Sequence, residues 1–226
     1  MVGHKLSDGF DNLKSQHHTC GFYDSQEERL QILADYYRTG LERHELCIFV
    51  SDQDPRDLVK KMVPYGLDAT TALKDGDFRI YPIKPTYLED GTFKSARMLD
   101  NLKGFVKNAL ALGYKGVRGG GDLDWLADKP EGWETAGEYE AKINRFIRAN
   151  KFTGICLFPK DLLDSEFTQD IIQTHQSMVR GNRLHDNPYY EPLEVLKGLG
   201  REMTESMRQI EQWLDKLDAQ ASPAEA

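Results

Sequence analysis

The sequence lacks the features that membrane proteins, secreted proteins and nucleic-acid-binding proteins share. No apolar run approaches the roughly 20 residues that a membrane-spanning helix needs, and the opening MVGHKLSDGF has no apolar segment typical of a secretory signal. Lysine and arginine number 29 against 37 acidic residues, a net charge of −8, and no basic cluster is dense enough to follow a phosphate backbone. We therefore expect a cytoplasmic protein with no direct contact to membranes or nucleic acid.

Cysteine is also scarce. Cys20, Cys47 and Cys156 are odd in number, and each lies inside an apolar run. This placement is typical of buried thiols in a reducing compartment. We expect no disulfide to support the fold.

The motifs of common enzymes are absent as well. A P-loop of the form GxxxxGK[ST] wraps phosphates with backbone amides and a lysine, whereas the first strand–helix junction here is YDSQEE, with the acidic residues Asp24, Glu27 and Glu28. No G-x-S-x-G elbow or GxGxxG fingerprint occurs. We expect neither a cofactor nor catalysis.

What the chain does contain is an alternation of strand and helix patterns over 226 residues, 39% of them hydrophobic. Strands are predicted at HHTCGFY and at residues 46–50, 77–83, 115–118 and 152–158. Helices are predicted after Ser25, after Asp54, and at about 95–112, 134–149 and 165–174; Ser25 with Glu28 forms a capping box, and Asp54 precedes a first-turn proline. This order predicts an α/β fold with a mostly parallel sheet covered by helices on both faces.

A different pattern begins at residue 193. Apolar residues follow a near-heptad spacing typical of a helix that pairs with a partner; they are Leu196, Leu199, Met203, Met207, Ile210, Leu214 and Leu217. We predict a C-terminal helix over residues 193–220 that serves dimerisation or signal output. The alternative is that the helix docks on the surface of its own domain.

Open parallel sheets bind ligands beyond the carboxyl ends of their strands. The residues at these positions are Tyr23, Asp24, Ser25, Ser51, Asp52, Asp54, Arg118, Gly119, Gly120, Gly121, Asp122 and Trp125. We interpret the three glycines as a turn with exposed amides beside the flat surface of Trp125, an arrangement suited to a small organic ligand. The alternative is a turn that only reverses the chain, with Trp125 as a lid on the core.

Metal sites have less support in the sequence. Asp24, Asp52, Asp54 and Asp122 are candidate ligands, but Ser25 and Asp54 in this region already serve as helix caps. His17 and His18 precede Cys20, yet alternation along a strand brings at most His18 and Cys20 to one face, and a zinc site usually needs at least three ligands. We predict no metal.

The stretch THQSMVRGNRLHDNPYYEP is rich in polar and aromatic residues. Asn187 before Pro188 predicts a turn, after which Tyr189 and Tyr190 can fold over the sheet edge and close a pocket. A plain linker to the last helix is the alternative.

Residues 14–192 together resemble the MEDS family, the methanogen/methylotroph sensory domain. The resemblance rests on the runs HHTCGFYDSQEERLQILADYYRTGLERHELCIFVSD, GLDATTALKDGDFRIY, YLEDGTFKSARMLDNLKGFVKNALALGYKGVRGGGDLDWL, EYEAKINRF and THQSMVRGNRLHDNPYYEP. It implies a RecA/KaiC-like three-layer α/β/α sensory module without a P-loop, found beside kinase or DNA-binding output modules and proposed to sense small hydrocarbon derivatives. The characteristic positions it implies are His18, Tyr23, Arg118, Trp125, Tyr139, Glu140, Cys156, His175, Asn187 and Tyr190.

The chain departs from the family pattern at three positions. Asp122 and Leu123 stand where the pattern has Glu–Met, and Gln176 follows His175 where it has proline. We expect these departures to bear on ligand choice or on whether sensing is retained.

Our hypothesis from the sequence is a non-catalytic sensor of a small organic ligand, such as a one-carbon or hydrocarbon derivative. Its pocket lies between the glycine turn, His18 and the aromatic loop, and its C-terminal helix signals within a homodimer or to a separate kinase or transcriptional output protein. One alternative is a protein-interaction adaptor, favoured if bulky side chains pack against Gly119 to Gly121. Another is a metal- or nucleotide-dependent enzyme with Asp52, Asp54 or Glu140 as its base.

Overall fold

The fold is built on one sheet with helices on both faces. The computed structural model describes residues 4–13, 15–164, 168–191 and 205–221. Within this part of the chain the strands follow the order β1-β8-β7-β2-β6-β5-β3-β4. Their bounds are His4–Lys5 (β1), His18–Tyr23 (β2), Leu46–Val50 (β3), Phe78–Tyr81 (β4), Val117–Asp122 (β5), Phe152–Pro159 (β6), Ser177–Arg180 (β7) and Arg183–Asp186 (β8).

Neighbouring strands from β7 to β4 run parallel, and β8 and β1 add antiparallel pairs at one edge. The prediction of a mostly parallel sheet is confirmed. The α-helices are Leu6–Asn12 (α1), Gln26–Glu42 (α2), Pro55–Met62 (α3), Thr70–Asp75 (α4), Ile83–Tyr87 (α5), Ser95–Ala111 (α6), Ala136–Ala149 (α7), Thr168–Thr174 (α8) and Glu205–Ala221 (α9).

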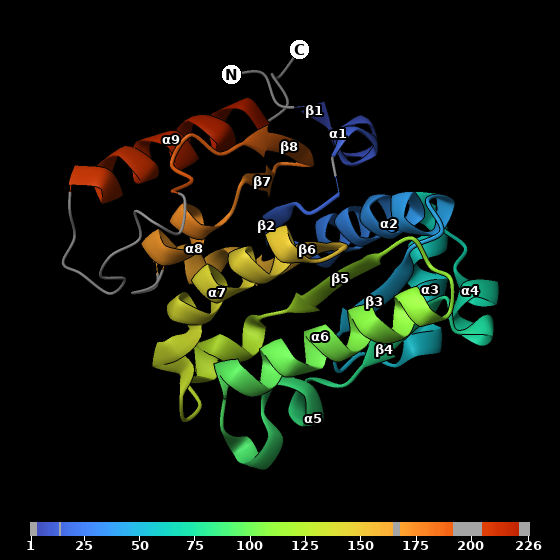
Figure 1. The fold of residues 1–226 in the computed structure, drawn as a ribbon. Helices are drawn as coiled ribbons and strands as arrows, with labels where there is room; N and C mark the ends of the chain where they lie inside the picture. The colour runs from blue at the N-terminus through green and yellow to red at the C-terminus, as the bar shows by residue number, and fades with distance from the viewer. Residues whose placement is uncertain (1–3, 14, 165–167, 192–204, 222–226) are drawn as a thin grey trace.

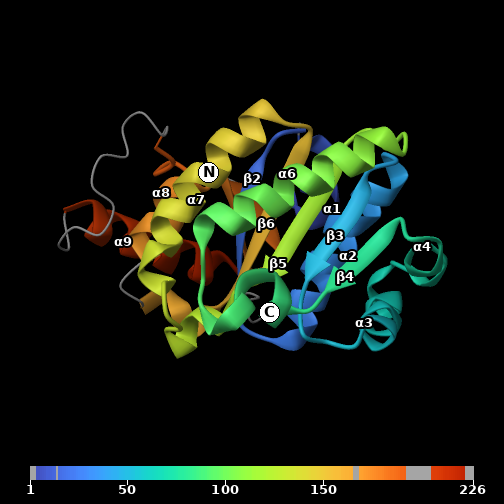
Figure 2. The ribbon, with the colours of Figure 1, turned by 60° about the horizontal axis from the view of Figure 1, so that its bottom comes forward.

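Two apolar cores lie on the two faces of the sheet. One core joins α1, α2 and α3 to the sheet, and the other joins α6, α7, α8 and α9 to the opposite face. Figure 2 shows α6 and α7 crossing one face of the strands. The central strand β2 is buried along its whole length because both faces are covered. The structure is thus the three-layer α/β/α arrangement that the sequence predicts.

Helix starts follow the predicted caps. The side chain of Ser25 accepts a hydrogen bond from the backbone N–H of Glu28 and begins α2. Asp54 accepts from the N–H groups of Arg56 and Asp57 and begins α3. Both caps satisfy amide groups that the first helical turn leaves without partners.

The predicted glycine turn is wrong. Gly119, Gly120 and Gly121 belong to β5 and pair in register with β3 and β6, and none of them has a positive φ. A glycine run predicts a turn from conformational freedom alone. Here the sheet requires small residues, because side chains from neighbouring elements occupy the space where a Cβ atom would lie.

The segment after His175 is a hairpin rather than a loop or linker. β7 and β8 are joined by Gly181 and Asn182, which have φ values of 56° and 54°. Positive φ at both central residues is the geometry of a type I′ turn, which matches the twist of paired strands. The predicted turn at Asn187 and the aromatic residues therefore come after the hairpin.

Residues before the predicted domain start also join the sheet. β1 pairs with β8, and α1 packs against α2 and β8. No helix among the described residues is long and apolar enough to cross a membrane.

Helix α9 docks on its own domain. Ile210, Leu214 and Leu217 are buried in the same core as α7 and α8, and Figure 1 shows α9 lying beside α8 and β7. This is the docked arrangement that the apolar stripe left open as an alternative to pairing. Leu196, Leu199, Met203 and the side chain of Met207 lie outside the described residues.

Candidate functional site

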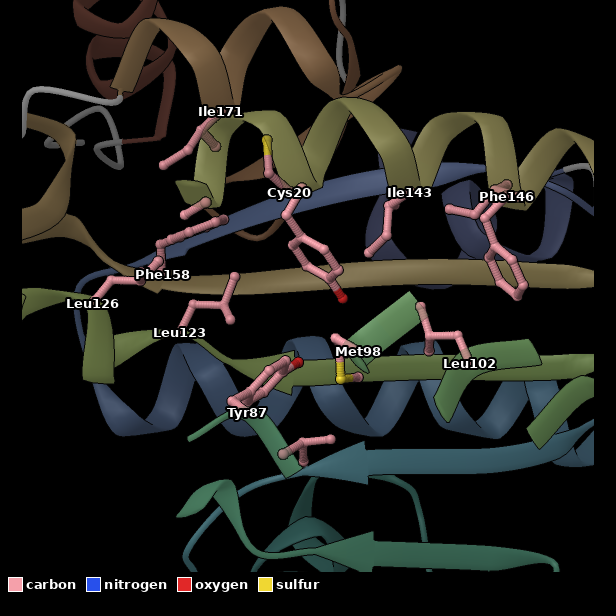
Figure 3. Close-up of a cluster of buried hydrophobic side chains, with 14 of the residues drawn as sticks. Cys20, Tyr87, Met98, Leu102, Leu123, Leu126, Ile143, Phe146, Phe158 and Ile171 are labelled. Atoms are coloured by element: carbon pink, nitrogen blue, oxygen red, sulfur yellow. The ribbon is translucent and has the colours of Figure 1, made fainter. Parts of the chain in front are cut away.

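A pocket lies on the α6/α7 face of the sheet, and we call it the face pocket. Its volume is about 40 Å³, on a measure by which one water molecule needs about 10 to 15 Å³. The residues that line it are His18, Ile48, Val50, Tyr87, Met98, Leu102, Phe105, Gly119, Gly120, Gly121, Leu123, Tyr139, Glu140, Ile143, Ile147, Phe152, Gly154, Ile155 and Cys156. Most of the wall is apolar, and Figure 3 shows Ile143 extending from α7 toward strand β6.

The floor of the face pocket is strand backbone. A Cβ atom on Gly119 would meet the ring of Phe152, and one on Gly121 would meet the hydroxyl of Tyr87. The glycines are therefore needed for the approach of these two rings. Bulky side chains do pack against the glycines, as the adaptor hypothesis expects, yet space remains between them and the helices above.

Four polar side chains from four different elements meet at one end of the face pocket. His18 begins β2, Glu140 lies on α7, Cys156 lies on β6 and His175 follows α8. His18 Nε2 is 3.5 Å from Glu140 Oε2 and 3.4 Å from Cys156 Sγ. His175 Nε2 is 3.6 Å from the same Glu140 oxygen. We call these four residues the polar cluster.

Hydrogen bonds orient both histidine rings. Asn144 donates from Nδ2 to the carbonyl of Thr174 at 2.5 Å, so its Oδ1 accepts from His18 Nδ1 at 3.2 Å. His175 Nδ1 donates to the carbonyl of Ile171 at 2.6 Å. In both neutral rings the proton lies on Nδ1, and the lone pair on Nε2 points toward Glu140.

Burial controls the charge of the polar cluster. It raises the pKa of Glu140 to about 8, against a lowering effect of the Cys156 hydrogen bond. Burial lowers the pKa of His175 to about 4, and burial followed by the neighbouring His175 lowers the pKa of His18 well below its usual value. Burial and the Glu140 carboxyl raise the pKa of the Cys156 thiol. With no cation present, these shifts favour four neutral groups near pH 7.

A second pocket lies beyond the carboxyl ends of β2, β3 and β5, and we call it the rim pocket. Tyr23, Ser51, Asp122 and Trp125 line it, as the rule for parallel sheets predicts. Its lining includes a buried ion pair, in which Arg29 Nε lies 2.8 Å and Nη2 lies 2.5 Å from the two oxygens of Asp122.

Trp125 acts as a lid on the core in this structure. Its ring centroid is 5.4 Å from that of Tyr87 and 5.2 Å from that of Phe93, and 7% of the residue is exposed. This packing is the alternative to a ligand-stacking surface that the sequence left open. Most of the predicted ligand residues thus divide between the rim pocket and the face pocket.

The predicted residues that line neither pocket include Arg118, Asn187 and Tyr190. Arg118 points to the α2 face, where its Nε is 2.6 Å from Glu45 and its guanidinium lies over the Tyr36 ring. Asn187 Nδ2 donates to the carbonyls of Ile172 and His175, and so braces the end of α8. The Tyr190 hydroxyl accepts from Arg148 near the surface.

The acidic residues considered for metal binding or catalysis do not converge. Asp54 caps α3, Asp122 pairs with Arg29, and Asp52 accepts a hydrogen bond from the N–H of Ile83 at 2.7 Å. Glu140 lies in the face pocket, away from the rim pocket that Asp52 lines. A shared acid–base role for these residues has no geometric support.

Arg29 and Asn144 were not predicted from the sequence as site residues. Asn144 follows Glu140 by four residues on α7, so one face of that helix carries both; this spacing was a readable signal. Arg29 lies one turn after the Ser25 cap, but its partner Asp122 is 93 positions away in the sequence. No local pattern reveals such a pair.

Comparisons with known proteins identify the family of this chain. The model of the MEDS family (MEthanogen/methylotroph, DcmR Sensory domain) matches residues 17–176. Transcriptional repressor DcmR of Methylorubrum extorquens is 23% identical over 162 residues, which are 70% of this chain and 58% of that protein. The chain therefore spans less than two thirds of that relative's length.

A solved structure shows the same fold. The KaiC-like protein PH0186 from Pyrococcus horikoshii OT3 superposes with a TM-score of 0.51 at 16% identity, covering 78% of this chain and 80% of that one. The family match covers more than half of the chain and includes all four residues of the polar cluster. The chain therefore belongs to the MEDS family of sensory domains, on a RecA/KaiC-like fold.

Proposed function

We propose that this MEDS domain senses a small organic molecule bound in the face pocket. The observation that carries the proposal is a pocket with apolar walls and one polar end, which is the usual composition of a small-molecule site. A volume of about 40 Å³ fits a molecule of a few heavy atoms, such as a one-carbon or short hydrocarbon derivative. Ile48, Met98, Leu102 and Ile143 surround its apolar part, and the polar cluster holds its polar end.

The same geometry supports a binding role without catalysis. The cluster's histidines are held by Asn144 and by the Ile171 carbonyl, and burial keeps the Cys156 thiol protonated by raising its pKa. A protonated thiol is a poor nucleophile. These groups suit recognition better than covalent chemistry.

Helix α8 offers a route by which a signal could pass from the face pocket to α9. Its end leads directly into His175, whose ring bonds the carbonyl of Ile171 within the helix. Its other contacts include α9, and Ile171 belongs to the same core as Leu214. A ligand that displaces His175 would shift α8 and change the docking of α9, as a two-state switch.

We propose that the domain passes its signal to a transcriptional regulator or to a kinase. The curated relative is named a transcriptional repressor, and this chain spans less than two thirds of it. In our proposal, release of α9 exposes Ile210, Leu214 and Leu217, which then pair with a second copy or with an output protein. Residues 14–192 would form the sensory part and residues 193–220 the output helix.

The test is thermal unfolding of the purified chain with a panel of one-carbon and short-chain alcohols, amines and halogenated compounds. We expect one class to raise the melting temperature with a saturable dose dependence. The variant Ile143→Phe fills the pocket and should lose this response, whereas Leu112→Phe, at a residue 65% exposed on the end of α6, should keep it. A melting temperature that no class changes would count against a sensor.

The adaptor hypothesis remains the second candidate because Phe152 and Tyr87 pack on the strand glycines. It predicts that the pocket is a packing void. In that case Ile143→Phe should stabilise the protein, and no compound should act on either protein.

A further inference from the structure

The polar cluster has the composition of a transition-metal site. It contains two imidazoles, one carboxylate and one thiol, and one ligand atom from each lies within 4.8 Å of every other. Nitrogen, oxygen and sulfur ligands of these types together are those that zinc takes in proteins. Alternation along a strand predicts that at most His18 and Cys20 share a face of β2. In the structure His18 instead meets Glu140 of α7, Cys156 of β6 and His175 after α8.

Four of the six separations between the ligand atoms match those around one ion, and the other two are at most 4.8 Å. Four ligands at about 2.0 to 2.3 Å from a zinc ion are separated from each other by about 3.3 to 3.8 Å in a tetrahedron. His18 Nε2 lies 3.5 Å from Glu140 Oε2 and 3.4 Å from Cys156 Sγ. Glu140 Oε2 lies 3.6 Å from His175 Nε2 and 3.7 Å from Cys156 Sγ.

The surrounding hydrogen bonds prepare the ligand atoms. Zinc-binding histidines commonly donate their other N–H to a carbonyl or carboxylate, which fixes the tautomer and the ring plane. His175 Nδ1 bonds the carbonyl of Ile171, and His18 Nδ1 bonds the side-chain carbonyl of Asn144. Both Nε2 lone pairs then face the centre of the cluster.

One atom of the cluster lacks a partner. His175 is fully buried, and its Nε2 has no hydrogen-bond partner among the described residues. Unsatisfied buried polar atoms are rare because each costs roughly 1 to 3 kcal/mol. Within the same residues, the Glu140 carboxyl lies beside two histidines and has no lysine or arginine partner. A cation at the centre would satisfy both groups.

We propose that His18, Glu140, Cys156 and His175 bind one Zn²⁺ ion. His18, Glu140 and Cys156 also line the face pocket, so the ion forms the polar end of that pocket. The inference goes beyond the proposed function, because the four side chains bind the ion with or without an organic ligand.

The first experiment measures metal content. The full chain is dialysed against a chelator, loaded with Zn²⁺ and freed of excess metal. Its zinc content is then measured by inductively coupled plasma mass spectrometry. We expect one zinc per chain, and a rise in melting temperature of about 5 to 10 °C when Zn²⁺ is 100-fold above its Kd. A zinc content below about 0.2 ions per chain, where a complete site would hold one, would overturn the proposal.

The second experiment identifies the ligands with Co²⁺ in place of zinc. A tetrahedral site with a thiolate gives visible cobalt bands and a near-ultraviolet sulfur-to-cobalt charge-transfer band. Cys156→Ser should abolish the charge-transfer band, and the matched control Cys47→Ser, at a buried thiol on the opposite face, should keep it. A band that survives Cys156→Ser contradicts the assignment.

Two further variants address the other ligands. Glu140→Gln is nearly isosteric, and His175→Ala removes the unpartnered nitrogen; each should lower Zn²⁺ affinity by at least about tenfold. His17→Gln is the matched histidine control, because His17 points away from the cluster toward Ser177. Far-ultraviolet circular dichroism confirms that each variant is folded, and unchanged affinity in folded Glu140→Gln and Cys156→Ser proteins overturns the proposal.

The zinc proposal and the sensor proposal can be tested separately. If zinc binds but no compound shifts the melting temperature of the loaded protein, the site stands and the sensor proposal fails. If a compound stabilises the chelator-treated protein and zinc does not bind, the sensor stands and the metal proposal fails.

Discussion

At the scale of single residues, the glycines of β5 are explained by the space that neighbouring side chains occupy and not by backbone flexibility. Gly119 lies in β5 because the Phe152 ring occupies the volume above it. The sequence marks the three glycines as special, but a run of glycines does not say whether a turn, a ligand or a neighbouring ring requires them. The answer depends on Phe152, 33 positions later, and on how β5 pairs with β6.

Substitution of Gly119 tests this explanation. Gly119→Ala should lower the free energy of unfolding by about 1 to 3 kcal/mol, because the new methyl group displaces the buried Phe152 ring. Gly104, in the interior of α6, has open space around it, so Gly104→Ala should raise the free energy of unfolding by about 0.5 to 1 kcal/mol. Urea unfolding of both variants gives the comparison, and equal effects would refute the steric argument.

The Arg29–Asp122 pair offers a second test. Arg29→Met leaves a buried carboxylate without its cation and should lower the free energy of unfolding by about 3 to 5 kcal/mol. The double variant Arg29→Met/Asp122→Leu removes both charges and should recover most of that loss. Denaturant titrations of the single and double variants measure it, and a double variant as unstable as the single one would contradict the charge argument.

The polar cluster shows what sequence reasoning gains from a family resemblance and what it misses alone. His18 and Cys156 are 138 positions apart, so no spacing rule connects them. The resemblance named His18, Glu140, Cys156 and His175 as characteristic positions. The resemblance did not show that these four residues are neighbours. They meet only because β2, β6, α7 and the end of α8 lie next to one another in the fold.

At the scale of elements, the strands and helices with strong local signals are the ones the sequence predicts well. β3 has the bounds 46–50 that its apolar run predicts, and α2 and α3 begin at their predicted caps. The β7–β8 hairpin was missed although Gly181–Asn182 between two short alternating runs is a recognised hairpin signal. β1 was missed because two residues carry no pattern, and its pairing with β8 alone defines it.

The docking of α9 depends on one ion pair as well as on apolar contacts. Asp218 accepts from Arg180 Nε at 2.5 Å and from Arg180 Nη2 at 2.8 Å, and Lys160 lies 3.4 Å away. The hydrogen bonds from Arg180 lower the pKa of Asp218, against an opposing effect of burial, and the nearby Lys160 adds to the lowering. A lowered carboxyl pKa means that the ionised form stabilises docking.

This stabilisation should disappear in acid. It is fully present above the ordinary aspartate pKa of about 3.9 and is lost as the pH falls through the lowered value. Since Asp218 is partly exposed, we expect a change of about 1 kcal/mol or less. Amide hydrogen exchange of residues 205–221, compared at each pH with the variant Asp218→Asn, measures it: the two proteins should converge as the pH falls and differ at pH 6, and identical exchange at both pH values would contradict the role of the pair.

At the scale of the whole molecule, the alternation of strands and helices was enough to predict the layers. A sheet with two covered faces follows from that alternation, and the structure agrees. The position of the face pocket could not be predicted, because the rule for open sheets directs attention to the strand ends. The volume between α6, α7 and β5 depends on how side chains from distant elements pack.

Coupling between the face pocket and α9 must be reciprocal if our proposal is right. Leu214→Ala removes a buried contact of α9 and should weaken its docking by about 2 to 5 kcal/mol. The affinity of the stabilising compound should then differ from that of the wild type by several-fold in calorimetric titration. Leu110→Ala, at an exposed residue of α6, is the control, and equal affinities in all three proteins would show that the two regions are independent.

The positions of the tryptophans give the protein its own optical labels. Trp213 on α9 packs against Tyr189, with ring centroids 5.5 Å apart, while Trp125 stacks on Tyr87 beside the face pocket. Trp133 lies under the ammonium group of Lys129, on a different segment. Two variants that each keep one indole, Trp125 or Trp213, with phenylalanine at the other two tryptophans, would therefore report pocket occupancy and helix release separately by intrinsic fluorescence, without an attached dye.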